Sequence, residues 1–204
     1  MSRDQVISYR RLRMIVGILG MGFPIVLAVL GLVLEDSSKT RPSISDYYHS
    51  DFRDLFVGVL CAISVFFLVY TGPRRRDDIA GDLACVFALG IAFLPTGHPD
   101  RAVAVGHGIA ATGLFLVLAY FALVLFPAPS PGGATPDRGS LLVFKYCGVL
   151  MLLCMLGALV YVLALPAVDP RASIQPLFWL EALALLAFGV SWFRKGQIAE
   201  SKSV

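Results

Sequence analysis

The chain has 204 residues, of which 57% are hydrophobic and 15% charged, and its formal net charge is +3. Soluble domains carry about 25% charged residues, so this chain lacks the polar residues that would cover a soluble fold of its size. The composition excludes a disordered chain, a collagen-like fibre and a disulfide-stapled secreted module. It indicates instead a protein that is embedded in lipid.

Uninterrupted apolar runs predict six transmembrane helices in chain order. A helix that crosses a ~30 Å hydrocarbon core needs about 20 residues, and roughly 17 to 25 are tolerated. Six runs meet this requirement: 14–34, 55–71, 79–95, 102–126, 141–165 and 174–193. The second and third are the shortest, and the third also contains Asp82. We therefore predict an all-α fold in which residues 1–204 form a single six-helix transmembrane domain.

The distribution of basic residues predicts the orientation of these helices. Twelve of the 17 Lys and Arg residues fall at the two termini or in the second and fourth loops, and five fall in the other loops. The positive-inside rule then places both termini in the cytoplasm and the loops 35–54, 96–101 and 166–171 outside. Because these flanks account for the net charge, no nucleic-acid partner is expected. The abundance of Ala, Leu, Gly and Arg suggests a bacterial inner membrane.

The four cysteines lie within predicted spans and lack the spacing of a zinc site or a disulfide framework. We interpret them as small buried hydrophobic residues. They are Cys61, Cys85, Cys147 and Cys154.

The loop 35–54 is the longest and most polar segment on the predicted outer side. It combines carboxylates with Tyr47, Tyr48 and Phe52, a mixture that suits a segment lying at the headgroup region with its rings towards the lipid. We name residues 43–54 the outer cap. Its candidate ligand-binding residues are Ser43, Ser45, Asp46, His49 and Arg53. A solvated loop with a few interfacial anchors is the alternative interpretation.

Three ionisable residues lie within the predicted spans, where each requires an explanation. Asp82 follows the start of the third helix, where unpaired amides and the helix dipole favour a carboxylate. On the same helix, alanines recur at every fourth position and predict a close contact with a neighbouring helix. Asp82 is offset from this stripe, which consists of Ala80, Ala84, Ala88 and Ala92.

His107 and Glu181 are the other two ionisable residues within the predicted spans. Counting from the outer ends of their helices at ~1.5 Å per residue, they lie about 7.5 Å and 10 Å deep. A carboxylate and an imidazole in the same layer of hydrocarbon are each other's least costly partners, so we predict that they pair directly or through water. Such a pair could bind a ligand, or it could simply join the fourth and sixth helices.

Two further chemistries remain open from the same residues. His49, His98 and His107 could hold a zinc ion, with Asp46, Asp54 or Glu181 as catalytic general base, which would make a metal-dependent lipid hydrolase. The histidines lack the i, i+4 spacing of a helical ligand pair, so no metal or other cofactor is expected. Alternatively, His107 and Glu181 could relay protons towards Asp82 in a carrier of protons or small solutes.

The outer cap carries a family resemblance. The segment Pro42-Ser43-Ile44-Ser45-Asp46, followed by aromatic residues and by Phe56-Val57-Gly58, resembles the P-x-I-S-D signature of membrane proteins of the damage-regulated autophagy modulator type. The same segment is similar to that of a bacterial membrane family of unknown function. The chain also resembles this family in its third predicted helix, which ends in Phe-Leu-Pro and is followed by His107. The resemblance covers about two thirds of the chain and implies six spans, an outward polar cap and a role in lipid handling. It assigns no catalytic residue or mechanism to this chain.

The Ser45-x-x-x-His49 spacing also resembles the first signature of alkaline ceramidases, but the last helix here carries Glu181 in place of that family's histidine pair. Taken together, the sequence favours a protein that binds or organises lipid headgroups through the outer cap, with His107 and Glu181 beneath it. Membrane lipids are the expected partners, and no protein partner is indicated. Whether the chain is an enzyme stays open.

Overall fold

The computed structural model describes residues 3–34, 40–129, 135–164 and 175–198, and these described residues form helices and connecting loops without any strand. The all-α prediction is therefore confirmed. The elements are α1 (Arg3–Leu34), the short 3-10 helix η1 (Ser45–His49), α2 (Arg53–Leu68), α3 (Arg75–Phe93), α4 (Arg101–Tyr120), the π-helical turn η2 (Phe121–Leu125), α5 (Arg138–Ala164) and α6 (Pro176–Gln197).

Four segments of the described chain are long and apolar enough to cross a membrane. They are Arg10–Leu34, Arg101–Leu125, Arg138–Leu163 and Pro176–Gln197. The remaining two predicted spans are helical but are not among these four. Helix α2 is shorter, with 16 residues, and α3 carries charged residues in its first turns. These are the same two runs whose length and charge were marginal in the sequence. The chain is thus a multi-pass membrane-associated protein.

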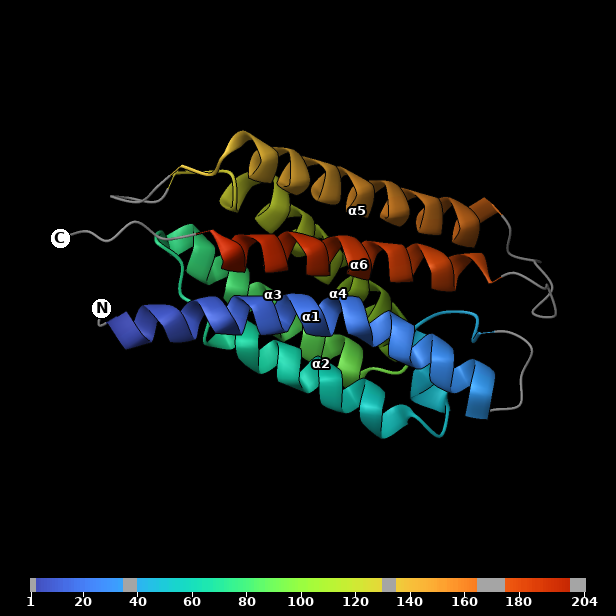
Figure 1. Ribbon diagram of the computed structural model, residues 1–204. Helices are drawn as coiled ribbons and strands as arrows, with labels where there is room; N and C mark the ends of the chain where they lie inside the picture. The colour runs from blue at the N-terminus through green and yellow to red at the C-terminus, as the bar shows by residue number, and fades with distance from the viewer. Residues whose placement is uncertain (1–2, 35–39, 130–134, 165–174, 199–204) are drawn as a thin grey trace.

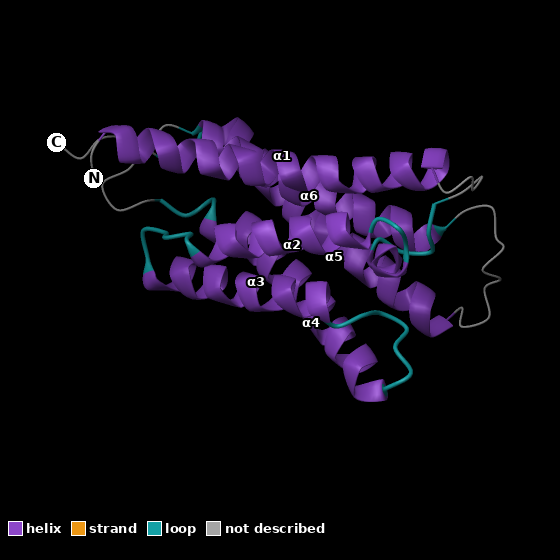
Figure 2. Cartoon of the chain, turned by 90° about the horizontal axis from the view of Figure 1, so that it is seen from below, coloured by secondary structure: helices purple, strands orange, loops and turns teal. Residues whose placement is uncertain are grey.

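The helices lie roughly alongside one another, with both termini at the same end of the bundle (Figure 1). The most extensive contacts join α1 to α6 and α5 to α6, followed by those of α2 with α3 and of α3 with α4. Figure 2 shows that α4 is inclined to the others, so that its Arg101 end projects from the bundle. We call the end that holds the termini the inner end, and the opposite end, which holds η1, the outer end.

Glycines allow α1 and α6 to approach until their backbones touch. A Cβ atom added at Gly189 would lie 2.5 Å from the carbonyl oxygen of Gly17 and 2.7 Å from the amide nitrogen of Met21. A Cβ atom at Gly17 would in turn lie 2.6 Å from the amide nitrogen of Phe193. Small residues at helix crossings are typical of helix packing in membranes, where close van der Waals contact drives association.

The predicted small-residue stripe on α3 is buried along its whole length. Ala84, Ala88 and Ala92 are fully buried and Ala80 is nearly so. On the adjacent face, a Cβ atom at Gly81 would lie 2.8 Å from the carbonyl oxygen of Phe67 in α2. Asp82 is exposed, as its offset from the stripe predicted. The recurrence of alanine at every fourth position of this helix therefore marks a packing face.

Aromatic rings fill the core of the inner half of the bundle. Trp192 on α6 is 2% exposed and packs edge-on against Phe67, Tyr70 and Phe121, with ring centroids 5.3 to 5.4 Å apart. Trp192 thus lies on the face of α6 that packs against the core. Trp179, by contrast, is exposed at the outer end.

The four cysteines are free thiols, as their spacing predicted. Cys85, Cys147 and Cys154 are buried, and Cys61 is half-buried. Each lies on a helix among apolar neighbours, and none of the four is part of a disulfide.

Basic side chains donate hydrogen bonds to the last carbonyl groups of helices at the inner end of the bundle. The guanidinium of Arg10 donates to the carbonyl oxygens of Gly196 and Gln197 at the end of α6. Arg74 donates to the carbonyl oxygen of Leu125, and Lys195 donates to that of Phe126. The last carbonyls of a helix have no partner within it, and cations there also complement the helix dipole.

Asp137 caps the start of α5 and makes stability pH-dependent. A hydrogen bond from the Ser140 hydroxyl, with smaller contributions from the Ser140 amide and the charge of Arg194, lowers the pKa of Asp137 below its ordinary value of 3.8. A carboxyl with a lowered pKa stabilises the folded state above its unfolded pKa, and this contribution is lost as the pH falls through the folded pKa.

We therefore expect thermal unfolding of the wild type and of Asp137→Asn to converge below about pH 4 and to separate above it, with the wild type more stable. Melting curves in detergent between pH 3 and 7 would measure this. A constant difference across that range would contradict the assignment.

Candidate functional site

The outer cap is fastened to the start of α6 by its backbone. The amide of Phe178, one of the unpaired amides in the first turn of α6, donates to the carbonyl oxygen of Pro42 at 3.1 Å. Three residues further on, Glu181 accepts a hydrogen bond of 2.6 Å from the amide of Ile44 and another from the backbone of Ser45. This carboxylate, which the sequence places deep in the sixth span, therefore holds the cap in position.

Tyr47 anchors the cap between two helices. Its ring is fully buried, and it lies 6.2 Å from the ring of Phe178 on α6. On the other side, a Cβ atom at Gly31 of α1 would collide with the Tyr47 hydroxyl oxygen, so the missing side chain of Gly31 makes room for this ring. The sequence predicted that the aromatic residues of the cap face the lipid, and for Tyr47 this was wrong, because its ring packs into the protein core.

Asp46 and Ser43 are joined by two hydrogen bonds in the first turn of the cap. The hydroxyl of Ser43 donates to Oδ2 of Asp46 at 2.9 Å, while the amide of Asp46 donates to the Ser43 oxygen at 3.1 Å. Ser43 and Ser45 are buried and Asp46 is half-buried. The second carboxylate oxygen of Asp46 makes no hydrogen bond within the described residues, so it is available to a ligand.

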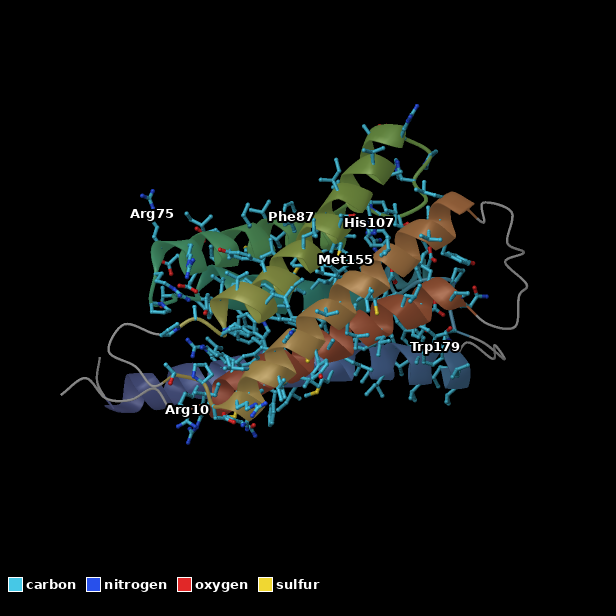
Figure 3. All side chains as sticks on the ribbon, turned by 90° about the horizontal axis from the view of Figure 1, so that it is seen from above. Arg10, Arg75, Phe87, His107, Met155 and Trp179 are labelled. Atoms are coloured by element: carbon cyan, nitrogen blue, oxygen red, sulfur yellow. The ribbon has the colours of Figure 1, made fainter. Side chains whose placement is uncertain are left out.

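His107 lies on α4, on the side of this helix that faces the bundle (Figure 3). It is 7% exposed, and its Nδ1 atom lies 2.6 Å from the carbonyl oxygen of Leu94. That carbonyl is at the end of α3, where Pro95 cannot continue the helix and the last carbonyls need outside partners. Because a carbonyl only accepts, Nδ1 donates, and Nε2 of the neutral ring is left as an acceptor.

The predicted direct pair of His107 and Glu181 is not formed. Each takes a backbone partner instead, because the end of α3 supplies a carbonyl to the imidazole and the cap supplies amides to the carboxylate. The structure thus brings Glu181 from the predicted ligand-binding set to the cap at Ile44 and Ser45, and it joins Ser43 to Asp46 within the cap. His107 is held separately, by Leu94 at the end of α3.

His49 and His98 have hydrogen-bond partners of their own. Nε2 of exposed His49 donates to the carbonyl oxygen of Thr96 at 2.8 Å, so the cap is also fastened to the loop between α3 and α4. The amide of Asp100 donates to Nδ1 of His98. Within the described residues, no group of three or more His, Cys, Asp or Glu side chains has a metal-binding arrangement. His49, His98 and His107 are thus not gathered as a ligand set.

Arg53 and Asp54 mark the outer surface of the cap. The guanidinium of Arg53 lies 4.4 Å from the ring centre of Tyr48 and donates to the Tyr48 hydroxyl at 2.6 Å. Asp54 is exposed in the first turn of α2. Of the candidate catalytic carboxylates, Asp46 and Glu181 are therefore both hydrogen-bonded to residues of the cap, Ser43 and Ile44, and Asp54 lies on the surface.

Leu94 and Tyr47 are the two contributors that sequence reasoning missed. For Leu94 a signal existed, because Pro95 predicts a helix end whose carbonyls seek donors and His107 is the nearest intramembrane donor along the chain. For Tyr47 no sequence signal distinguishes it from neighbouring Tyr48, since the choice depends on the turn made by η1.

No family model matches the chain, and no match was found among curated proteins or among solved structures.

Proposed function

We propose that the protein binds lipid headgroups at the outer cap. The observation that carries this proposal is that Asp46 in the cap and His107 on α4 retain acceptor atoms without partners among the described residues. The cap is fastened at Pro42, Ile44 and Tyr47, so Asp46 is held in a fixed position. Preorganised polar groups in an otherwise apolar surrounding are typical of ligand sites.

The surroundings of the cap favour a lipid as its ligand. The helices that frame it expose large apolar side chains, including Ile109 on α4 and Trp179 on α6. A membrane-embedded surface of this kind offers acyl chains a place beside a polar group, and an exposed Trp suits the headgroup region. The resemblance of the Pro42–Asp46 segment to proteins associated with lipid handling is in keeping with the same role.

The proposal includes a topology. We propose that α2 and α3 also cross the membrane, which makes six spans in a bacterial inner membrane with both termini in the cytoplasm. The shared end of the two termini requires an even number of crossings (Figure 1). The basic residues Arg10 and Arg75 lie at the end opposite Trp179 (Figure 3), as the positive-inside rule requires for a cytoplasmic end.

Cysteine labelling in whole cells would test the topology. We expect Ser50→Cys to react with a membrane-impermeant maleimide added outside, and Arg75→Cys to react only after the cells are opened. The wild type, whose own cysteines lie within helices, gives the background. Labelling of both positions from the same side would overturn the six-span arrangement.

Lipid retention would test the function. We expect purified wild-type protein to keep phospholipid through prolonged detergent washing, and Asp46→Ala to lose most of it, because the substitution removes an acceptor of the site. Asp82→Ala, which removes an exposed carboxylate on α3, is the matched control. Lipid phosphorus per protein is the measurement, and equal retention in all three proteins would overturn the headgroup site.

A further inference from the structure

Helix α5 is the least covered of the four candidate membrane spans. It lies at one side of the bundle (Figure 1), where it packs mainly on α6 and less extensively on α4 and η2. In its most apolar stretch 17% is buried, compared with 39% to 44% in the other three spans. Most of the surface of α5 therefore faces the lipid in a membrane.

A cationic side chain lies in the middle of this lipid-facing surface. Lys145 is exposed within the apolar span, and its neighbours on the same face, Leu142 and Val149, are exposed too. The opposite face of α5 carries Cys147 and Met151, which are buried. A charged side chain that faces lipid within a span is costly and generally reaches out to polar groups.

Arg138 supplies a second positive charge on the same face. It is exposed at the start of α5, at the inner end of the bundle. At about 3.6 residues per turn and ~1.5 Å per residue, Lys145 lies two turns further on, about 10 Å along the axis. Side chains of a helix tilt towards its N-terminus, so the ammonium of Lys145 extends towards Arg138 and the headgroup region.

The protein does not neutralise these two cations. Within the described residues, neither Arg138 nor Lys145 takes part in a hydrogen bond or an ion pair. The adjacent carboxylate of Asp137 is engaged by Ser140 and Arg194 instead. Cations at the edge of a span attract anionic lipids, so the charge complement of this face is a lipid with net negative charge.

We propose that this face of α5 binds a phospholipid of net negative charge. The headgroup phosphate lies between Arg138 and Lys145, and the acyl chains lie along the exposed side chains that follow, which include Val149, Leu153 and Leu156. Zwitterionic phospholipids offer the same phosphate, but their own ammonium group offsets its charge. The site is at the inner end of the bundle and goes beyond the headgroup site proposed at the outer cap.

Quenching of tryptophan fluorescence by brominated lipids would test the site at its own position. The reporter is Tyr146→Trp, which keeps an aromatic ring at an exposed position beside Lys145. Reporter and wild-type proteins are placed in mixtures of phosphatidylglycerol and phosphatidylcholine, in which one lipid carries bromine on its acyl chains. Subtracting the wild-type signal removes the quenching of the two native tryptophans. We expect phosphatidylglycerol to bind beside the reporter about fivefold more tightly, the ratio that one cation near an anionic lipid produces, or more.

Substitutions in the reporter protein locate the preference. Lys145→Gln and Arg138→Gln should each lower the ratio of the two binding constants, and the double substitution should bring it to about one. Arg75→Gln removes an exposed cation of α3 at the same end of the bundle (Figure 3) and should leave the ratio unchanged. Melting curves of these variants, all at exposed positions, confirm that the fold persists.

Every outcome bears on the proposal. A ratio near one in the reporter protein would overturn it. A preference that persists in the double variant, or that Arg75→Gln lowers equally, would show a general effect of surface charge and would overturn the assignment to α5. Asp46→Ala, at the outer end, should leave the ratio unchanged, so this site and the headgroup site at the outer cap can fail independently.

Discussion

Replacing Gly189 by alanine is expected to destabilise the protein by roughly 1–3 kcal/mol or more, the usual cost of overpacking a tight contact. The added methyl carbon would lie 2.5 Å from the carbonyl oxygen of Gly17. Because this neighbour is backbone, the contact is relieved only by separating α1 from α6. The free energy of unfolding, measured by titration with a denaturing detergent, is the readout.

Gly58 on α2 provides the matched control for this substitution. A Cβ atom there would have no neighbour within 4 Å, so Gly58→Ala should be neutral or stabilising by about 0.5–1 kcal/mol through helix propensity alone. Equal effects at the two positions would show that the close approach of α1 and α6 does not contribute to stability.

The second large effect is expected for Glu181→Ala. It removes the acceptor of the Ile44 amide, which is 2.6 Å from the carboxylate, and a buried donor that loses its partner costs about 1–3 kcal/mol. The cap is then held by fewer contacts. We expect hydrogen exchange of the amides of Ile44 and Ser45 to accelerate about tenfold or more, since 1.4 kcal/mol corresponds to a factor of ten.

Two comparisons make this result interpretable. Glu181→Gln keeps an acceptor oxygen and should accelerate exchange less than the alanine substitution does. Asp82→Ala removes a carboxylate that lies exposed on α3 and should leave exchange in the cap unchanged. If exchange at Ile44 is the same in Glu181→Ala as in the wild type, then Glu181 does not hold the cap.

Local patterns were sufficient to predict the helices. The apolar runs located each helix, and the structure extends most of them by a few residues into polar flanks, because hydrogen bonding continues past the point where hydropathy falls. Thus α3 begins at Arg75, four residues before its apolar run. The alanine stripe of the same helix predicted its packing face correctly, because helical geometry alone places residues four positions apart on one face.

The partners within the candidate site were only partly predictable. Depth along each helix placed His107 and Glu181 near the same end, where the structure gives each a backbone partner, Leu94 for His107 and Ile44 for Glu181. Depth says nothing about the backbone groups that compete for these side chains, however. Those groups come from the cap and from the end of α3, whose positions depend on tertiary packing. The direct pair was predicted because only side chains were weighed.

The contact between Gly17 and Gly189 joins the first helix to the last. The two residues are 172 positions apart in the chain, so a ribosome adding 5–20 residues per second needs roughly 9 to 34 s to make the second after the first. During that time α1 resides in the bilayer with its glycine surface facing lipid or other helices. The bundle consequently closes only after α6 has been synthesised, and a nascent chain that stops before α6 leaves α1 without its principal packing partner.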